Sequence, residues 1–195
     1  EKITRPIHRA ATQIPITKAV IYEMSVRDFS MQKEAGFTYS GKFKSLTESP
    51  DLQEHTLGMD YVKQLGVTHI QLMPVYDFGS VDENHPELVY NWGYDPMQYN
   101  LPDGSFATNP HDPYTRIVEL QGAIAAYHQA DISVIMDVVY NHVYNPQTYA
   151  FEKIVPGYFF RYDHNANLTN GTFCGNDVAS ERAMVRSYIK HSLKQ

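Results

Sequence analysis

The sequence predicts an α/β fold built on parallel strands, and two observations carry that prediction. The strand candidates are short, continuous apolar runs, as expected for strands that are covered on both faces. Each run is followed by a long polar segment and then by a helical pattern of apolar residues. Right-handed β-α-β connections would make the strands parallel and gather the polar segments at their carboxyl ends, where α/β proteins carry their active sites.

The first unit covers residues 19–66 and follows an irregular lead-in over residues 1–18. Residues 19–24 form its strand. Apolar positions between residues 57 and 65 predict a helix. We expect this helix to end at Gly66, because the position after a helix favours left-handed backbone, which glycine adopts easily.

The second unit covers residues 67–131. A long loop over residues 75–112 follows the strand at residues 67–73, and we expect it to lack regular structure. Such long loops are uncommon unless they are functional or disordered, and the repeated aromatic residues here indicate order. A helix over residues 114–130 is then predicted to end at Asp131, a residue type that tolerates left-handed backbone.

The third unit covers residues 132–195. Its strand at residues 133–138 leads into a second long loop over residues 139–178. A last helix is predicted from Ala179, with Ser180 as its N-cap.

Three such units are fewer than half of a (β/α)8 TIM barrel, which takes about 250 residues. An open sheet is the alternative, but a sheet of three strands would leave two bare edges, which proteins avoid. The chain also begins without Met and stops within the last predicted helix. We therefore expect about the first three units of a larger α/β barrel.

Composition excludes several classes of function. The net charge of −6 and the pI near 5.8 argue against nucleic-acid binding, which needs basic patches. No apolar run is long enough to span a membrane, and no signal peptide is visible. The single cysteine, Cys174, excludes an internal disulfide and a cysteine-rich zinc site.

Polar residues follow the third strand directly: Asp137 ends the apolar run, and Asn141 and His142 come shortly after it. This pattern predicts a site at the strand tip. A buried histidine that only satisfies its own hydrogen bonds is the alternative for His142. A zinc site is disfavoured, because the other histidines lack the usual ligand spacing.

The loop after the second strand contains an aromatic heptad, Tyr90-Asn91-Trp92-Gly93-Tyr94-Asp95-Pro96. Tryptophan and tyrosine faces can stack on the apolar face of a sugar ring, while Asp and Asn accept hydrogen bonds from its hydroxyl groups. Gly93 permits a tight turn between two large side chains. The residues alone leave open a packed turn in which Trp92 and Tyr94 only fill space.

Three motifs carry a family resemblance that covers nearly all of the chain from Ala19 onward. The heptad resembles the signature of type I pullulanases, the α-1,6-debranching members of the α-amylase superfamily of glycoside hydrolases. The run from Asp137 to His142 resembles the first motif shared by that superfamily, at the end of the third barrel strand. The run from Gly175 to Arg182 resembles a further pullulanase motif, and the three occur in the family's order.

The resemblance implies roles for individual residues. His142 would donate a hydrogen bond to the sugar whose bond is cleaved, and Tyr94 would stack under the same ring. Asp95 would hydrogen-bond nearby or hold a catalytic arginine from elsewhere, and Asp137 would orient its neighbours. The remaining substrate-binding candidates are Asn91, Trp92 and Asn141.

The resemblance also implies what this chain lacks. Retaining glycoside hydrolysis needs a nucleophile and an acid/base about 5–5.5 Å apart. In the family these follow the fourth and fifth strands, and no Gly-Phe-Arg-Phe-Asp type motif occurs here; Arg27 and Asp28 have a different context. We therefore expect the isolated chain to be inactive, with α-glucans and the remainder of the barrel as its partners.

Two further expectations concern the cofactor and the compartment. No cofactor is required by the expected mechanism. Calcium is left open, because Asn141 matches an amide that binds calcium in many amylases, while calcium needs six or more oxygen ligands. A cytoplasmic and a secreted bacterial enzyme both fit the sequence.

Three rival functions are considered. The first is another hydrolase of the superfamily, of the amylase or isoamylase type. The second is a non-catalytic α-glucan-binding module, although such modules are usually β-sandwiches. The third, a phosphate-binding α/β protein, should show a glycine-rich loop that opens a helix, and the sequence has none.

Overall fold

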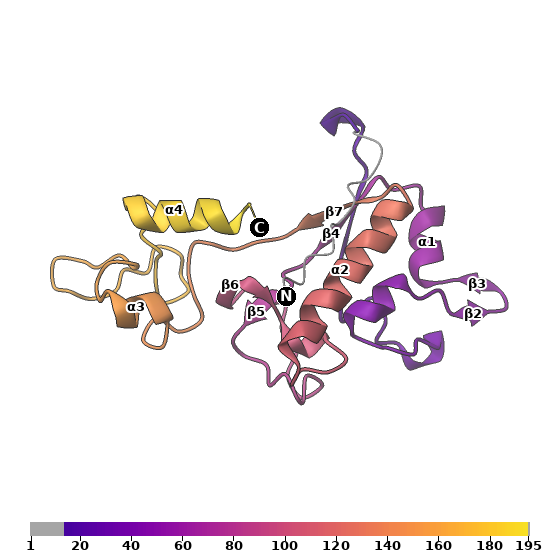
Figure 1. Cartoon of the computed structure of the whole chain (residues 1–195), viewed down its shortest axis with the longest axis horizontal. Coiled ribbons are helices and arrows are strands. Elements are labelled where there is room, and N and C mark those ends of the chain that lie inside the picture. Colours follow the sequence, from indigo (N-terminus) through magenta and orange to yellow (C-terminus); the bar gives the residue numbers. More distant parts are fainter. Residues whose placement is uncertain (1–13, 195) are drawn as a thin grey trace.

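The computed structural model describes residues 14–194, which are organised around a parallel sheet (Figure 1). Its strands lie in the order β1 (Ile21–Met24), β4 (His69–Leu72) and β7 (Ser133–Met136). The first residues of the three strands, Ile21, His69 and Ser133, lie opposite one another. The predicted parallel arrangement is therefore confirmed. The first part of the predicted lead-in, residues 1–13, lies outside the described residues.

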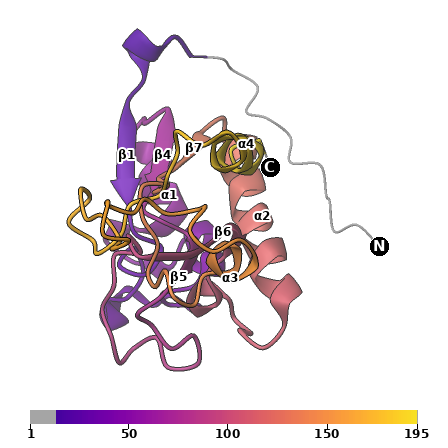
Figure 2. The same ribbon diagram turned by 90° about the vertical axis from the view of Figure 1, so that its left-hand side faces the viewer.

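Two helices connect these strands, and both end where the sequence predicts. Helix α1 (Gly58–Gln64) precedes β4, and Gly66 just beyond it has a φ of +67°. Helix α2 (Pro113–Gln129) precedes β7, and Asp131 beyond its end has a φ of +60°. Left-handed backbone at both positions breaks the helical hydrogen-bond pattern and turns the chain back into the sheet. Figure 2 shows α2 running beside the sheet.

The loop after β4 contains regular structure that the sequence pattern does not predict. Strands β5 (Tyr76–Phe78) and β6 (Pro96–Pro102) pair in an antiparallel hairpin with an irregular register, and a short 3-10 helix, η4 (Gly104–Phe106), follows. The expectation of an irregular loop was therefore wrong over these residues. The strands escape detection because prolines and polar residues interrupt their alternation, and because their pairing joins residues far apart in the sequence.

The loop after β1 is likewise folded into short elements. It contains the 3-10 helices η2 (Lys33–Ala35) and η3 (Phe43–Thr47) and a small hairpin of β2 (Asp51–Leu52) and β3 (His55–Thr56). A further 3-10 turn, η1 (Ile16–Lys18), precedes β1. Phe43 and Leu46 of η3 are fully buried, so this loop contributes to the core.

The third unit differs from the prediction at its helix. Helix α4 (Ala183–Ser192) begins after Arg182, which makes no side-chain cap, so Ser180 is not the N-cap. The chain before α4 is instead held by neighbouring loops, because the Ala179 N–H donates to the carbonyl of Phe159. Figure 1 shows α4 and the short α3 (Ala150–Ile154) beyond the carboxyl end of β7 and apart from the sheet.

Two buried clusters hold the structure together through burial of apolar surface. The larger packs the sheet against η3, α1 and α2 and includes Met24, Leu46, Val62, Ile70 and Tyr127. The smaller packs β6 against the segments around α3 and α4 and includes Tyr99, Val143, Phe159, Phe160, Val178 and Val185.

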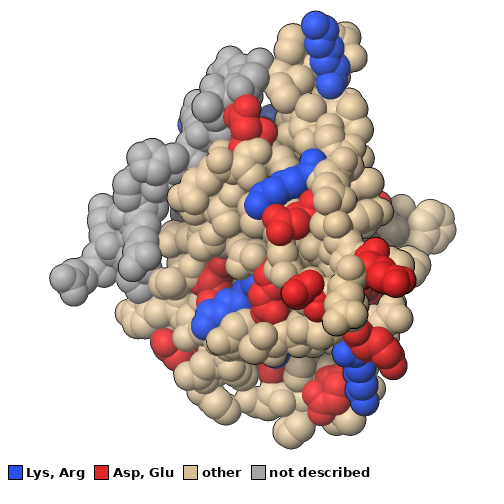
Figure 3. Space-filling view, turned by 90° about the vertical axis from the view of Figure 1, so that its right-hand side faces the viewer, with Lys and Arg blue, Asp and Glu red and all other residues tan. Residues whose placement is uncertain are grey.

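Two further features concern the surface charges and the helices. Figure 3 shows one face of the molecule, on which basic side chains lie among acidic ones rather than in a single patch. Within residues 14–194, no helix has the length and apolar character needed to cross a bilayer.

Candidate functional site

The aromatic heptad and the tip of β7 meet in the folded chain. The Tyr94 hydroxyl donates a hydrogen bond to Asp137 Oδ2 at 2.7 Å, across 43 residues of sequence. The His142 Nε2 atom lies 2.8 Å from the backbone carbonyl oxygen of Tyr94. The structure therefore brings together two of the predicted motifs at the carboxyl ends of neighbouring parallel strands, β4 and β7.

His142 is held on both sides of its ring. Its side chain is buried, with 7% of the residue exposed. While Nε2 faces the Tyr94 carbonyl, Nδ1 lies 2.8 Å from Asn141 Oδ1. Both ring nitrogens therefore lie within hydrogen-bond distance of an oxygen atom. A sugar hydroxyl that binds His142 must therefore displace one of these two oxygen partners.

Tyr94 is a permanent hydrogen-bond donor in this site. Burial raises the pKa of its hydroxyl to about 12, and the hydrogen bond to the Asp137 carboxylate adds to the effect. The phenol consequently stays protonated at neutral pH, and its ring is tethered at the end distant from the backbone. A tethered ring is suited to stacking, because its orientation is set before a ligand arrives.

Asn91 and Asp95 stabilise the heptad through hydrogen bonds between its own residues. The Asn91 side chain accepts a hydrogen bond from the Gly93 N–H and donates one to Asp95 Oδ1, both at 2.8 Å. Asp95 Oδ2 accepts from the backbone N–H of Ser80 at 3.1 Å and also from its hydroxyl. Both carboxylate oxygens of Asp95 thus have partners within this loop, and among residues 14–194 Asp95 pairs with no arginine.

Gly93 occupies a position that no larger residue fits. Its φ is +86°, and a Cβ atom built there would lie 2.9 Å from the Pro74 carbonyl oxygen. The heptad backbone therefore packs directly onto the end of β4, as the expected tight turn requires.

Trp92 points away from the core. The residue is 61% exposed, and its indole N–H donates to the Tyr90 hydroxyl at 3.0 Å. A side chain that only filled space in a packed turn would be buried. Within the described residues Trp92 therefore does not pack into the turn, while half-buried Tyr94 combines packing with its hydrogen bond.

The Gly175–Arg182 motif makes hydrogen bonds to the backbone on both sides of His142, which its residue types alone did not predict. The Asn176 side chain bonds the backbone of Val143, beside His142, and the Val178 N–H donates to the Asn141 carbonyl at 2.9 Å. The order of the motifs is the one feature of the sequence that indicates this arrangement, because Asn176 and Val143 are more than 30 residues apart.

Asp177 in the same motif stabilises the neighbouring loop. Its carboxylate accepts hydrogen bonds from the Thr169 hydroxyl and from the backbone N–H groups of Gly171 and Thr172. Desolvation acts to raise the pKa of Asp177, but these hydrogen bonds outweigh it and lower the pKa to about 2. The carboxylate is therefore ionised at neutral pH and remains bound to the loop.

Comparison with known proteins now identifies the family. The family described as "Alpha amylase, catalytic domain" matches residues 29–163, which include the heptad and the β7 tip. The chain belongs to the α-amylase family. Strands β4 and β7 and the two motifs lie within the matched residues.

Within the α-amylase family, several of the similar proteins are pullulanases. A Bacillus subtilis pullulanase is 51% identical over 173 residues, which make up 88% of this chain and 24% of that protein. The pullulanase from Anoxybacillus sp. LM18-11, solved with maltotetraose, is 50% identical with a TM-score of 0.92. It matches over 98% of this chain and 28% of its own. The chain spans about a quarter of the length of these relatives, and the predicted resemblance to pullulanases is confirmed.

A third structure supports the same relationship. The Paenibacillus barengoltzii pullulanase, solved with maltohexaose and α-cyclodextrin, is 46% identical with a TM-score of 0.90. The match covers 96% of this chain and 30% of that chain.

One acidic cluster within the described residues has the composition of a metal site. It lies at the β5–β6 hairpin and consists of Asp77, Glu83 and Asp103. Arg116 enters the same cluster, with Nη2 2.6 Å from Glu83 Oε2. A guanidinium there repels a second cation, and calcium needs six or more oxygens. The Arg116 guanidinium therefore disfavours calcium in this cluster, and Asn141, the residue for which the sequence left calcium open, lies outside it.

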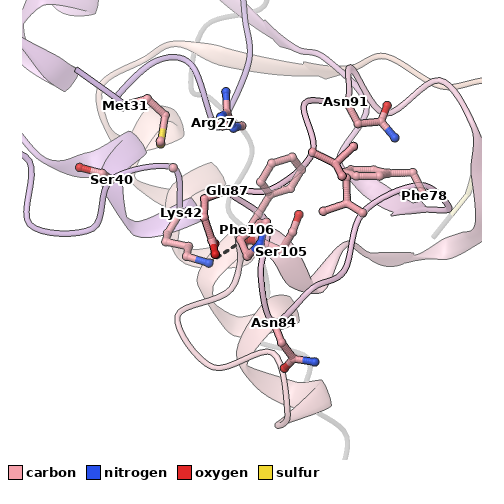
Figure 4. Close-up of a pocket in the computed structure, with 14 residues that line it drawn as sticks. Arg27, Met31, Ser40, Lys42, Phe78, Asn84, Glu87, Asn91, Ser105 and Phe106 are labelled. Atoms are coloured by element: carbon pink, nitrogen blue, oxygen red, sulfur yellow. Dashed lines mark hydrogen bonds between the residues drawn. The ribbon is translucent and has the colours of Figure 1, made fainter. Parts of the chain in front are cut away.

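A cavity of about 270 Å³ lies beside the heptad (Figure 4). Arg27, Met31, Phe78, Asn91 and Phe106 contribute to its wall, whereas Tyr94 and His142 do not. The Lys42 ammonium donates to the Ser105 carbonyl at 2.7 Å, and burial lowers its pKa. This cavity is therefore adjacent to the Tyr94–His142 site but separate from it.

Proposed function

We propose that this chain forms the first three β/α units of the catalytic barrel of a debranching glycoside hydrolase. The enzyme would cleave α-1,6-glucosidic bonds in pullulan, starch or glycogen, and the unit boundaries are those predicted, at residues 19–66, 67–131 and 132–195. The observation that carries the proposal is the hydrogen bond between Tyr94 and Asp137, because it joins the pullulanase-type heptad to the strand motif shared by the superfamily.

In this proposal the chain binds and orients the sugar while other segments perform the bond cleavage. His142 donates to the ring that becomes positively charged, and Tyr94 stacks beneath it, held by Asp137. Trp92, Asn91, Asp95 and Asn141 complete this side of the cleft. A nucleophile and an acid/base beyond this chain supply the retaining double displacement. Positioning of the ring lowers the barrier because the reacting groups no longer lose orientational freedom in the transition state.

The exposed apolar residues of the sheet support a partner that completes the barrel. Ile21 of β1 is 51% exposed and Met136 of β7 is 42% exposed. Strands of a parallel sheet are normally buried on both faces. The remainder of the same catalytic barrel is the partner that would cover them, with an α-glucan as the substrate.

Reducing-sugar release tests the proposal. The catalytic protein that contains this chain is expected to release sugar from pullulan, while the 195-residue chain alone releases none. Linear amylose, which lacks α-1,6 bonds, is the control substrate. Release from amylose with none from pullulan would overturn the debranching assignment.

Two alternatives lead to different outcomes in the same assay. An isoamylase-type enzyme would debranch glycogen but leave pullulan intact; the chloroplastic isoamylase 3 of rice is 28% identical, below the 51% of the Bacillus pullulanase. A glucan-binding module would bind these polymers without releasing sugar, and the match to a catalytic-domain family disfavours it.

A further inference from the structure

The indole of Trp92 is exposed and yet has a hydrogen-bond partner that limits its orientation. Its N–H donates to the Tyr90 hydroxyl at 3.0 Å, and 61% of the residue remains exposed. A solvent-exposed side chain normally samples several rotamers, and ordering it on binding costs free energy. The hydrogen bond to Tyr90 removes part of that freedom in advance.

Tyr90 is itself held by the loop after β1. Its hydroxyl donates to Asp28 Oδ2 at 2.5 Å. The Arg27 guanidinium carbon lies 5.0 Å from the centre of the Tyr90 ring, and Arg27 Nη1 lies 3.0 Å from Asp28 Oδ1. The Tyr90 ring thus has a charged hydrogen-bond partner at its tip and a cation over its face.

We propose that Arg27, Asp28 and Tyr90 are positioning residues that hold the Trp92 indole as a stacking platform for a glucose ring outside the Tyr94–His142 site. The sugar-binding part of this inference rests on the proposed function. The opposite charges of Arg27 and Asp28 offset each other, so the platform suits a neutral ligand such as a glucan rather than an ion. A preset aromatic face binds more tightly because less freedom is lost on binding.

The chain carries its own reporter for this arrangement, because Trp92 is its single tryptophan. Tyr90→Phe removes the hydroxyl that links the indole to Asp28 while keeping the ring. We expect lower steady-state fluorescence anisotropy of Trp92 and stronger quenching by acrylamide. Asp28→Asn, which weakens the same chain of contacts, is expected to change both signals in the same direction.

Tyr114→Phe is the matched control. Tyr114 is 57% exposed on α2, so its variant should leave the Trp92 signals unchanged. Circular dichroism of each variant separates local release of the indole from loss of the fold. Unchanged anisotropy and quenching in folded Tyr90→Phe would overturn the proposal.

Titration of the catalytic protein that contains this chain with maltotriose tests the sugar-binding part. We expect Tyr90→Phe to weaken the affinity roughly 2- to 10-fold, the loss associated with one hydrogen bond, and Tyr114→Phe to leave it unchanged. A released indole with unaltered affinity would overturn the stacking role. If that catalytic protein does not bind maltotriose at all, the assignment of Trp92 to the cleft fails, while the anisotropy result still decides whether Tyr90 holds the indole.

Discussion

The side-chain amide of Asn176 bonds both polar groups of the Val143 backbone, directly after His142. Asn176 Oδ1 accepts from the Val143 N–H at 2.9 Å, and Nδ2 donates to the Val143 carbonyl at 2.7 Å. Both residues are 1% exposed. The backbone directly after His142 is therefore held by a residue from the loop before α4.

Asn176→Ala should destabilise the protein. The variant leaves a buried N–H and a buried carbonyl without partners, and each such group costs about 1–3 kcal/mol. We expect the free energy of unfolding in urea to fall by about 2 kcal/mol or more. Asn165→Ala, at an exposed loop position, is the control. Equal stability of the two variants would contradict the role of Asn176.

Gly93→Ala should also destabilise the protein, for a steric reason. The new Cβ would lie 2.9 Å from the Pro74 carbonyl oxygen, in backbone with a φ of +86°. We expect a loss of about 1–3 kcal/mol in the free energy of unfolding. Gly122→Ala is the control, because it lies at an exposed position of α2 where an added Cβ would have no heavy atom within 4 Å apart from its chain neighbours and the backbone of its own helix. That variant should instead stabilise the protein by about 0.5–1 kcal/mol.

Asp77 should make stability fall with rising pH. Burial raises the pKa of its carboxyl from 3.8 to about 7, and the charges of Asp103 and Glu83 add to the effect. The folded state therefore favours the protonated acid. The stabilisation of the folded state by protonated Asp77 is fully present below about pH 4. This stabilisation is lost as the pH rises through about 7.

Unfolding in urea at a series of pH values checks this expectation. Asp77→Asn should flatten the loss of stability between about pH 4 and pH 7, while Asp51→Asn, at an exposed strand position, should retain it. An Asp77→Asn variant with the pH profile of the parent would show that another group is responsible.

His142→Ala should reduce turnover of pullulan by roughly 100-fold or more in the catalytic protein that contains this chain, because the sugar loses a positioning contact. Circular dichroism should show an intact fold. His85→Ala, at an exposed loop position, should keep full activity. Full activity of His142→Ala would remove His142 from the cleft.

Local sequence patterns predicted the helices and strands that depend on residues close together in the sequence. Continuous apolar runs marked β1, β4 and β7, and the left-handed positions at Gly66 and Asp131 marked two helix ends. The predicted start of α4 was wrong, because long-range backbone hydrogen bonds of Ala179 replace the predicted cap at Ser180. The β5–β6 hairpin was missed for the same reason, since its pairing depends on the folded chain.

The sequence by itself determined the parallel α/β class, the order of the main elements and the motifs that identify the family. Those features follow from the periodicity of apolar residues and from residue types at neighbouring positions. Only the tertiary structure decided that Tyr94 bonds Asp137, that Asn176 holds the backbone beside His142, and that Trp92 is exposed. These contacts join residues far apart in the chain, so they depend on how the sheet and its loops pack rather than on local pattern.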